Sequence, residues 1–200
     1  LAGESFDSLS VLLAVNPAPL DRPWNTPGLP DEGFLRGKAP MTKEEVRTLA
    51  VAKLRLLAHH VVWDVGAGTG SVSVELALAC PAGRVYAVEC KEEALELLAE
   101  NRARFGVSNL ELVAGTAPEV LKNLPAPDRV FLGGTSGELE GILHLIFAKN
   151  PAARVVCTAV TLETVGEAAR CFAGLEKAEM VQVAVTRARP AGRYHLMDAQ

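Results

Sequence analysis

The sequence predicts an α/β fold, in which a mostly parallel sheet is covered by helices on both faces. Short apolar runs, typical of buried strands, alternate with helical stretches of about 10–15 residues. A glycine-rich turn, residues 64–70 (DVGAGTG), joins the apolar run 61–63 to a helix that starts at Ser71. The next apolar run ends at Glu89, about twenty residues further on, where a ribose diol can be hydrogen-bonded. We therefore expect a nucleotide-like cofactor at the carboxyl ends of the strands.

The composition describes one ordinary soluble domain. The chain has 200 residues, of which 49% are hydrophobic and 22% charged, enough for a full core. No apolar run reaches the ~18 residues of a membrane span, and no basic-then-apolar start predicts a signal peptide, so we expect a cytoplasmic protein without membrane contact. The net charge of −4 disfavours nucleic acid as a partner. The four cysteines form no C-x-x-C pair, so we expect reduced thiols and no metal site.

The N-terminal part has a different character. Residues 8–15 predict one strand, and residues 16–30 contain five prolines, which indicates an extended linker. We expect residues 1–29 to be the end of a preceding domain with its linker, and residues 30–200 to be the main domain. Thr42 and Glu45 have capping-box spacing, and an apolar face follows, which predicts a helix over residues 42–59.

The other elements follow in order after the glycine-rich turn. Helices are predicted over 71–80, 91–105 and 139–147, with a short one ending at Leu124 and another opening at Thr161. Strands are predicted over 84–89, 110–114, 128–132, 154–159 and 178–186.

The glycine spacing helps to separate two cofactor classes. Dinucleotide folds prefer G-x-G-x-x-G, whereas this chain has G-x-G-x-G directly after Asp64-Val65. The pattern D-x-G-x-G-x-G resembles motif I of class I S-adenosylmethionine (SAM) methyltransferases. That resemblance implies a Rossmann-like, mostly parallel seven-stranded sheet, whose final antiparallel strand would begin at residues 195–198. An NAD-type cofactor and a purely structural turn are the alternatives.

Several stretches together resemble one family, the decarboxylating precorrin-6Y C(5,15)-methyltransferases of cobalamin biosynthesis. They are residues 30–34, 40–47, 64–70, 115–119, 133–139 and 158–164. The resemblance covers residues 29–197 and matches the C-terminal domain of that family. It implies SAM-dependent methylation of carbon 15 and decarboxylation of an acetate side chain on a precorrin tetrapyrrole. It also implies a homotetramer, fused in some members to an N-terminal tetrapyrrole methylase domain.

The same resemblance implies the residues of the cofactor site. The implied SAM contacts are Thr42, Gly66, Ala67, Gly68, Thr69, Gly70, Glu89 and Ala117. Thr116 stands where relatives often have Asp, so the adenine contact there would come from the backbone of Ala117. No residue is singled out as a catalytic acid or base.

The substrate of such an enzyme carries many carboxylates, which favours Arg and Lys as its ligands. By charge and expected location the candidates are Arg36, Lys38 and a cluster of Arg187, Arg189 and Arg193. Gly134 and Glu138 are further candidates, because the loop after the fourth strand faces the transferable methyl group. For Glu138 the alternative is a carboxylate that merely stabilises a helix N-terminus.

Two other functions remain open from the sequence. A class I methyltransferase could act on RNA or on a protein carboxylate, although the acidic balance disfavours RNA. Alternatively, the chain could be a SAM-binding module whose activity depends on an N-terminal domain.

Overall fold

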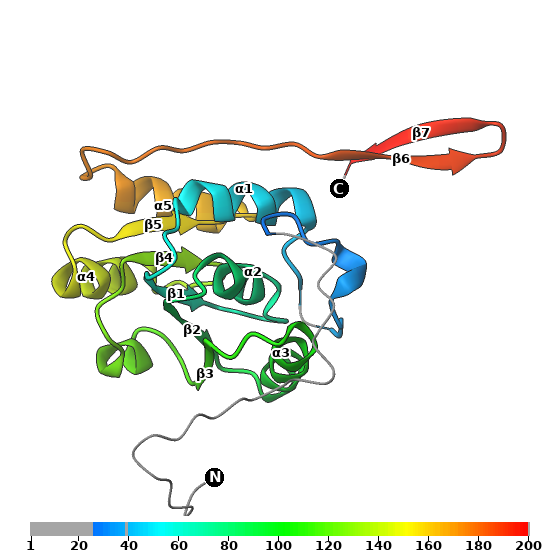
Figure 1. Ribbon diagram of the computed structural model, residues 1–200. Coiled ribbons are helices and arrows are strands. Elements are labelled where there is room, and N and C mark those ends of the chain that lie inside the picture. The colour runs from blue at the N-terminus through cyan, green and yellow to red at the C-terminus, as the bar shows by residue number, and fades with distance from the viewer. Residues whose placement is uncertain (1–25, 39, 200) are drawn as a thin grey trace, which may run out of the picture.

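A parallel five-stranded sheet lies at the centre of the computed structural model, which describes residues 26–38 and 40–199 (Figure 1). The strand order is β3-β2-β1-β4-β5, and every neighbouring pair is parallel. The strands are β1 (Val61–Val65), β2 (Arg84–Glu89), β3 (Leu110–Ala114), β4 (Arg129–Leu132) and β5 (Arg154–Cys157). The order reverses between β1 and β4, and in such sheets ligands bind at the carboxyl ends of the strands at this switch point.

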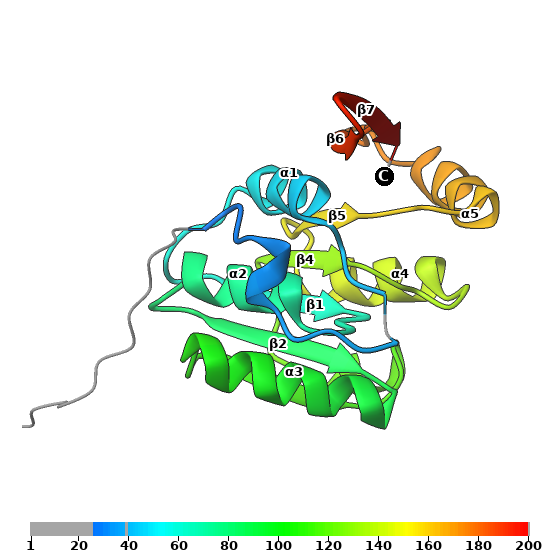
Figure 2. The same ribbon diagram turned by 90° about the vertical axis from the view of Figure 1, so that its right-hand side faces the viewer.

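Helices cover both faces of the sheet (Figures 1 and 2). They are α1 (Glu44–Leu54), α2 (Ser71–Ala79), α3 (Glu92–Phe105), α4 (Leu139–Lys149) and α5 (Leu162–Phe172), with the 3-10 helices η1 (Asp31–Gly33) and η2 (Glu119–Asn123). Side chains of β1 alternate between two cores: Val62 packs with α1, α2 and α3, whereas Trp63 and Val65 pack with α4 and α5. Asp64 therefore points to the α2 side, beneath the glycine loop.

The predicted fold class is confirmed, but the C-terminal strands differ from the prediction. The parallel sheet has five strands rather than seven. β6 (Thr186–Ala191) and β7 (Tyr194–Ala199) pair with each other as an antiparallel hairpin that projects away from the sheet (Figure 1). The strand predicted over 178–186 is wrong, because residues 178–185 form no strand pairing. Pairing begins only at Thr186. From there β6 runs to the turn at Gly192, whose φ of 62° reverses the chain and brings β7 alongside β6.

The helix predicted over 42–59 is shorter than expected. α1 ends at Leu54, because Arg55 adopts a left-handed conformation with φ of 51°. The expected capping box is also wrong: Lys43 is the N-cap residue and makes no side-chain cap. The carbonyl of Thr42 instead accepts a hydrogen bond from Arg47 Nη1 at 2.6 Å.

The segment before α1, residues 26–38 and 40–43, runs over the α1, α2 and α3 side of the sheet. We call it the N-terminal strap. Glu75 of α2, fully buried, holds its start by accepting from Thr26 Oγ1, Gly28 N and Leu29 N at 2.8, 2.8 and 3.1 Å. The strand expected over residues 8–15 lies outside the described residues, and so does the linker expected over residues 16–30 up to residue 25. The last residues of that linker, 26–30, form the start of the strap.

Arg47 of α1 holds the strap from the other side. It is fully buried and donates to Glu75 Oε1 at 2.6 Å, to Asp31 Oδ1 at 3.0 Å, and to the Leu29 carbonyl. Its guanidinium also lies 4.8 Å from the centre of the Phe34 ring. Buried charges are tolerated when they are paired and hydrogen-bonded, and this network meets both conditions.

Within residues 26–38 and 40–199, no helix is long and apolar enough to cross a membrane.

Candidate active site

The glycine loop, residues 66–70, leads from β1 into α2 as predicted. Gly66, Gly68 and Gly70 all adopt positive φ, of 76°, 55° and 78°, a region that favours glycine. Gly70 is the N-cap of α2 and has no side chain to cover the helix end. The loop thus presents bare backbone and a helix N-terminus, the geometry that binds the negative or polar end of a nucleotide-like ligand.

The loop after β4, residues 133–138, lies directly against the glycine loop. A Cβ atom built on Gly66 would lie 2.7 Å from Gly134 N and 2.8 Å from Gly134 O, so the two backbones touch. The N–H groups of Gly133 and Gly134 both donate to the Val65 carbonyl, at 2.9 and 3.3 Å. The two glycine-rich stretches that the sequence places about seventy residues apart therefore meet at the switch point of the sheet.

Glu89, at the end of β2, faces the same loop. Its Oε2 accepts from Gly68 N at 2.9 Å, and its Oε1 accepts from Cys90 N and Lys91 N at 2.8 and 3.0 Å. Burial opposes the charge of this carboxylate, but the N–H groups of Lys91, Gly68 and Cys90 outweigh it and lower its pKa below the ordinary value. Glu89 is therefore ionised near neutral pH, as an acceptor of hydroxyl groups must be.

Beneath the loop lies a second carboxyl group, that of Asp64, whose pKa is shifted in the opposite direction. Asp64 is fully buried, and this burial raises its pKa to about 7, although the hydrogen bond from Ser73 Oγ lowers it and the nearby charge of Glu89 raises it. Asp64 Oδ1 and Thr69 Oγ1 are buried without a hydrogen-bond partner among the described residues. Two unpartnered polar atoms at the loop indicate a place where a ligand or an ordered water completes the site.

Two further predicted residues lie on segments that border the loop. Thr42 belongs to the strap, and a Cβ atom on Gly68 would lie 3.2 Å from the carbonyl oxygen of Pro40, so the strap passes the loop at Pro40, two residues before Thr42. Ala117 follows β3, where Gly115 N donates to the Glu89 carbonyl at 2.9 Å. The structure therefore groups the predicted cofactor residues around the ends of β1, β2 and β3.

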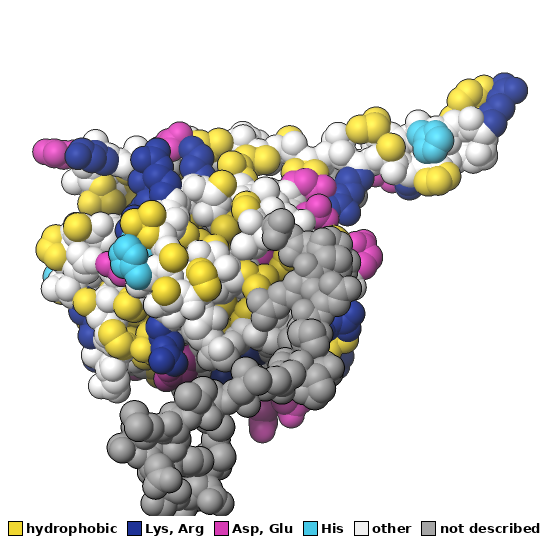
Figure 3. All heavy atoms as spheres, viewed as in Figure 1, with side chains coloured by type: hydrophobic (Ala, Val, Ile, Leu, Met, Phe, Trp, Pro, Cys, Tyr) yellow, Lys and Arg dark blue, Asp and Glu magenta, His cyan; other side chains and the backbone are white. Residues whose placement is uncertain are grey.

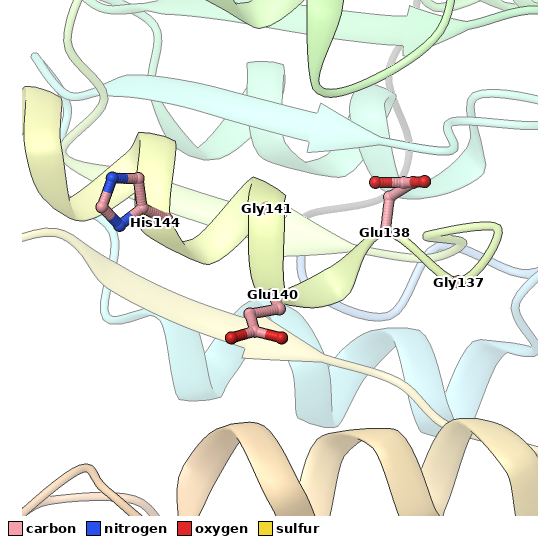
Figure 4. A pocket seen from close by; sticks show the side chains of 5 residues that line it. All are labelled: Gly137, Glu138, Glu140, Gly141 and His144. Atoms are coloured by element: carbon pink, nitrogen blue, oxygen red, sulfur yellow. The ribbon is translucent and has the colours of Figure 1, made fainter.

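Two of the predicted substrate residues, Gly134 and Glu138, lie on the loop after β4. Gly134 touches Gly66, and Glu138 is the N-cap residue of α4, where its side chain makes no cap. A cavity of about 450 Å³ opens beside it, lined by Gly137, Glu138, Glu140, Gly141 and His144 (Figure 4). Figure 4 shows the carboxylates of Glu138 and Glu140 pointing away from each other, so they do not form a carboxylate pair.

Most of the basic candidates have partners of their own. Arg187 pairs with Glu45 of α1 at 2.8 Å, Arg189 pairs with Asp198 across the hairpin, and Arg193 lies over the ring of Tyr194. Arg36, which is exposed, lies 3.8 Å from Asp31, and Lys38 is exposed on the strap. Each of the three arginines thus has a partner of its own, on α1, across the hairpin or in the next residue, and a shared anion site at Arg187, Arg189 and Arg193 stays a prediction.

Sequence reasoning missed the residues that hold the site together. Arg47 shares a helical face with Ala50, Val51 and Leu54, and Asn101 shares one with Ala94, Leu98 and Phe105; all of these are buried. A polar side chain at a core position of an amphipathic helix was the available signal, because such a group must find buried partners.

The strand order, the glycine loop after β1 and the carboxylate at the end of β2 define a Rossmann-like fold of the class I methyltransferase type. The fold is shared with a SAM-dependent O-methyltransferase from Thermotoga maritima, with a TM-score of 0.65 over 79% of this chain and 60% of that chain at 16% identity.

The chain belongs to the family described as the precorrin methyltransferase domain, whose model matches residues 34–200. A relative from Pyrobaculum calidifontis, named a probable cobalt-precorrin-6B C(15)-methyltransferase (decarboxylating), is 47% identical over 182 residues, covering 88% of this chain and 93% of that protein. The solved structure of a precorrin-6Y C5,15-methyltransferase from Geobacter metallireducens superposes with a TM-score of 0.79 at 35% identity, over 86% of this chain and 93% of that chain. The family predicted from the sequence is thus confirmed.

Proposed function

We propose that this domain methylates carbon 15 of a precorrin tetrapyrrole and removes carbon dioxide from its acetate side chain, with SAM as methyl donor, in cobalamin biosynthesis. The observation that carries the proposal is the contact between the two glycine loops at Gly66 and Gly134. This contact lies beside Glu89. The relative from Pyrobaculum calidifontis that is named for this reaction is 47% identical to the chain.

The donor set fits SAM. Glu89 is ionised and buried at the end of β2. Its Oε2 accepts only from Gly68 N and keeps a lone pair for a ribose hydroxyl, whereas Oε1 already accepts from Cys90 N and Lys91 N. The glycine loop offers backbone groups to the methionine part, and the two unpartnered atoms Asp64 Oδ1 and Thr69 Oγ1 belong to the loop and to the strand end that leads into it. Thr42 on the strap and the backbone of Ala117 after β3 would complete the site. SAM supplies a methyl group on a cationic sulfur.

The protein's own task is mainly placement. A carbon nucleophile of an electron-rich macrocycle needs no strong base, and correct orientation of two bound reactants is worth up to ~7–11 kcal/mol. The Gly133 and Gly134 backbone, fixed to the Val65 carbonyl, forms a rigid and side-chain-free surface beside the cofactor loop. Such a surface admits a large flat substrate close to the methyl group.

For the substrate carboxylates we propose Arg36 and Lys38, two exposed cations of the strap a few residues before Pro40, where the strap passes Gly68. Glu138 lies at the far end of the loop after β4, beside the cavity at α4, and is our candidate for contact with the macrocycle. Its exposed carboxylate is suited to a ring N–H donor rather than to a substrate carboxylate.

Association into a homotetramer is a further proposal. Apolar side chains of the hairpin and of the segment leading to it are exposed, and Figure 3 shows such side chains along the projecting hairpin. They are Met180, Val181, Val183, Tyr194, Leu196 and Met197. Exposed apolar side chains on a projecting hairpin support contact with other copies. Light scattering of the chain and of a Leu196→Ser, Met197→Ser variant tests this: a tetramer that dissociates in the variant is expected, and a monomeric parent contradicts it.

The resemblance to fused precorrin methyltransferases supports two other proposals. Residues 1–29 are the end of a tetrapyrrole methylase domain together with the proline-rich linker, and the enzyme works in the cytoplasm. The net charge of −4 supports a small-molecule partner rather than a nucleic acid.

The direct test is incubation of the chain with SAM and a precorrin-6-type substrate, followed by mass spectrometry. The expected product has gained one methyl group and lost one carbon dioxide. SAM binding without any change of the tetrapyrrole would contradict the proposed reaction and would favour a module that depends on another domain.

A further inference from the structure

Asn101, in the second half of α3, connects two segments of the candidate cofactor site that lie far apart in the sequence, the strap and the glycine loop. It is fully buried, although it lies on a helix whose other polar side chains are mostly exposed. Its Oδ1 accepts from Leu35 N at 2.8 Å, and its Nδ2 donates to the Leu35 carbonyl at 3.1 Å. The side chain thus pairs with both backbone groups of Leu35, as a neighbouring strand would.

The same amide nitrogen also donates to the Thr69 carbonyl of the glycine loop at 2.9 Å. One side chain therefore holds the strap and the glycine loop together, and all three of its hydrogen bonds go to backbone groups. Both hydrogens of Nδ2 and one lone pair of Oδ1 are used, so a buried Leu or Ala here would leave three backbone groups without this partner.

The strap continues from Leu35 toward the cofactor loop. Gly37 packs so closely on α3 that a Cβ atom there would lie 2.7 Å from Leu97 Cδ1. A few residues later the Pro40 carbonyl passes 3.2 Å from the position of a Cβ on Gly68. Leu35, which Asn101 holds in place, thus lies between the buried start of the strap and Pro40, where the strap passes the glycine loop.

We propose that Asn101 is a positioning residue for the cofactor: it locks the strap to the glycine loop, so that residues 40–42 form a wall of the SAM site. This inference rests on the proposed SAM site at the glycine loop. Because coupling between two equilibria is reciprocal, a strap that strengthens cofactor binding must itself be stabilised by the cofactor.

Asn109 offers a matched control. Its Nδ2 also donates to two backbone carbonyls, those of Ala77 and Cys80 at 2.9 and 2.8 Å, but at the opposite end of α2 from the glycine loop. Asn101→Leu and Asn109→Leu should both lower the melting temperature. Only Asn101→Leu should also weaken the binding of the cofactor.

The experiment is calorimetric titration of the parent and both variants with S-adenosylhomocysteine. We expect Asn101→Leu to raise Kd about fivefold to tenfold, the effect of roughly one net hydrogen bond, whereas Asn109→Leu leaves Kd within about twofold of the parent. Equal Kd values in all three proteins overturn the inference, and so does an equal loss in both variants, which would mean general destabilisation. A folded parent that does not bind overturns the proposed cofactor site itself.

Hydrogen exchange on the unaltered chain tests the inference should Asn101→Leu fail to fold. Saturating S-adenosylhomocysteine should slow exchange of the Leu35 amide and of the amides of residues 41–43, together with those of the glycine loop. Slower exchange in the glycine loop with no change at Leu35 or in residues 41–43 overturns it.

Discussion

Replacing Asp64 with Asn should remove a pH dependence from the stability of this domain. The carboxyl group is fully buried beneath the glycine loop, and burial raises its pKa from 3.8 to about 7. The folded protein therefore holds a proton that the unfolded chain releases between these two values. Stability must fall as the pH rises through this interval, because the unfolded state binds fewer protons there.

The magnitude follows from the width of that interval. Each pH unit in the middle of it costs about 1.4 kcal/mol, and less near its two ends, so the free energy of unfolding should fall by roughly 3 kcal/mol between pH 4 and pH 7 from this group alone. Asn has nearly the same shape and can still accept from Ser73 Oγ, but it does not titrate. The variant should therefore gain stability relative to the parent as the pH rises.

Urea unfolding of both proteins at pH 5, 6, 7 and 8, without cofactor, measures the difference. Ser73→Ala is the informative companion, because it removes a hydrogen bond that lowers the pKa of Asp64 and should extend the fall in stability to higher pH. Parallel pH profiles for the parent and Asp64→Asn would refute the reasoning, since the buried carboxyl group would then not be protonated in the folded state.

Two other substitutions test the framework of the site. Arg47→Met should lower the free energy of unfolding in urea by about 3–5 kcal/mol, because it removes the buried guanidinium from Asp31 and leaves the buried carboxylate of Glu75 without its cationic partner. Arg187→Met, which breaks a partly exposed pair, should cost less than about 1 kcal/mol, and similar losses in the two variants would contradict this account. Gly66→Ala should abolish S-adenosylhomocysteine binding in calorimetry, because its φ is 76° and its Cβ would lie 2.7 Å from Gly134 N; a folded variant that binds as the parent does would contradict the loop geometry.

Much of the central fold was predictable because its signals are local. The strands β1 to β4 are short apolar runs, and the glycine loop and Glu89 stand at fixed distances from their ends. The family was predictable as well, because several loop sequences resemble it in order. The three glycines of the loop adopt the left-handed conformation, which explains why the motif contains them: the chain turns sharply there and presents bare backbone at the sheet edge.

What the sequence did not predict depends on long-range partners. Residues 178–186 have strand-like composition, but a strand forms only where another strand pairs with it, and pairing begins at Thr186. The arginines at 187, 189 and 193 are close in sequence, but nothing in the sequence indicates their individual partners, which lie on α1, across the hairpin and in Tyr194. Asn101 was assigned to an ordinary amphipathic helix, because its partners lie 32 and 66 residues away.

The central claim is that SAM binds at the glycine loop with Glu89 on its ribose. Calorimetric titration with S-adenosylhomocysteine, on the parent, on Glu89→Ala and on Glu93→Ala, tests it most directly. Glu93 provides the control, because it is an exposed carboxylate on the first turn of α3. The account predicts micromolar binding to the parent and to Glu93→Ala, with a loss of about tenfold or more in Glu89→Ala, since a charge-assisted hydrogen bond contributes about 1.5–3 kcal/mol. A folded parent that does not bind, or a Glu89→Ala variant that binds as tightly as the parent, would contradict it.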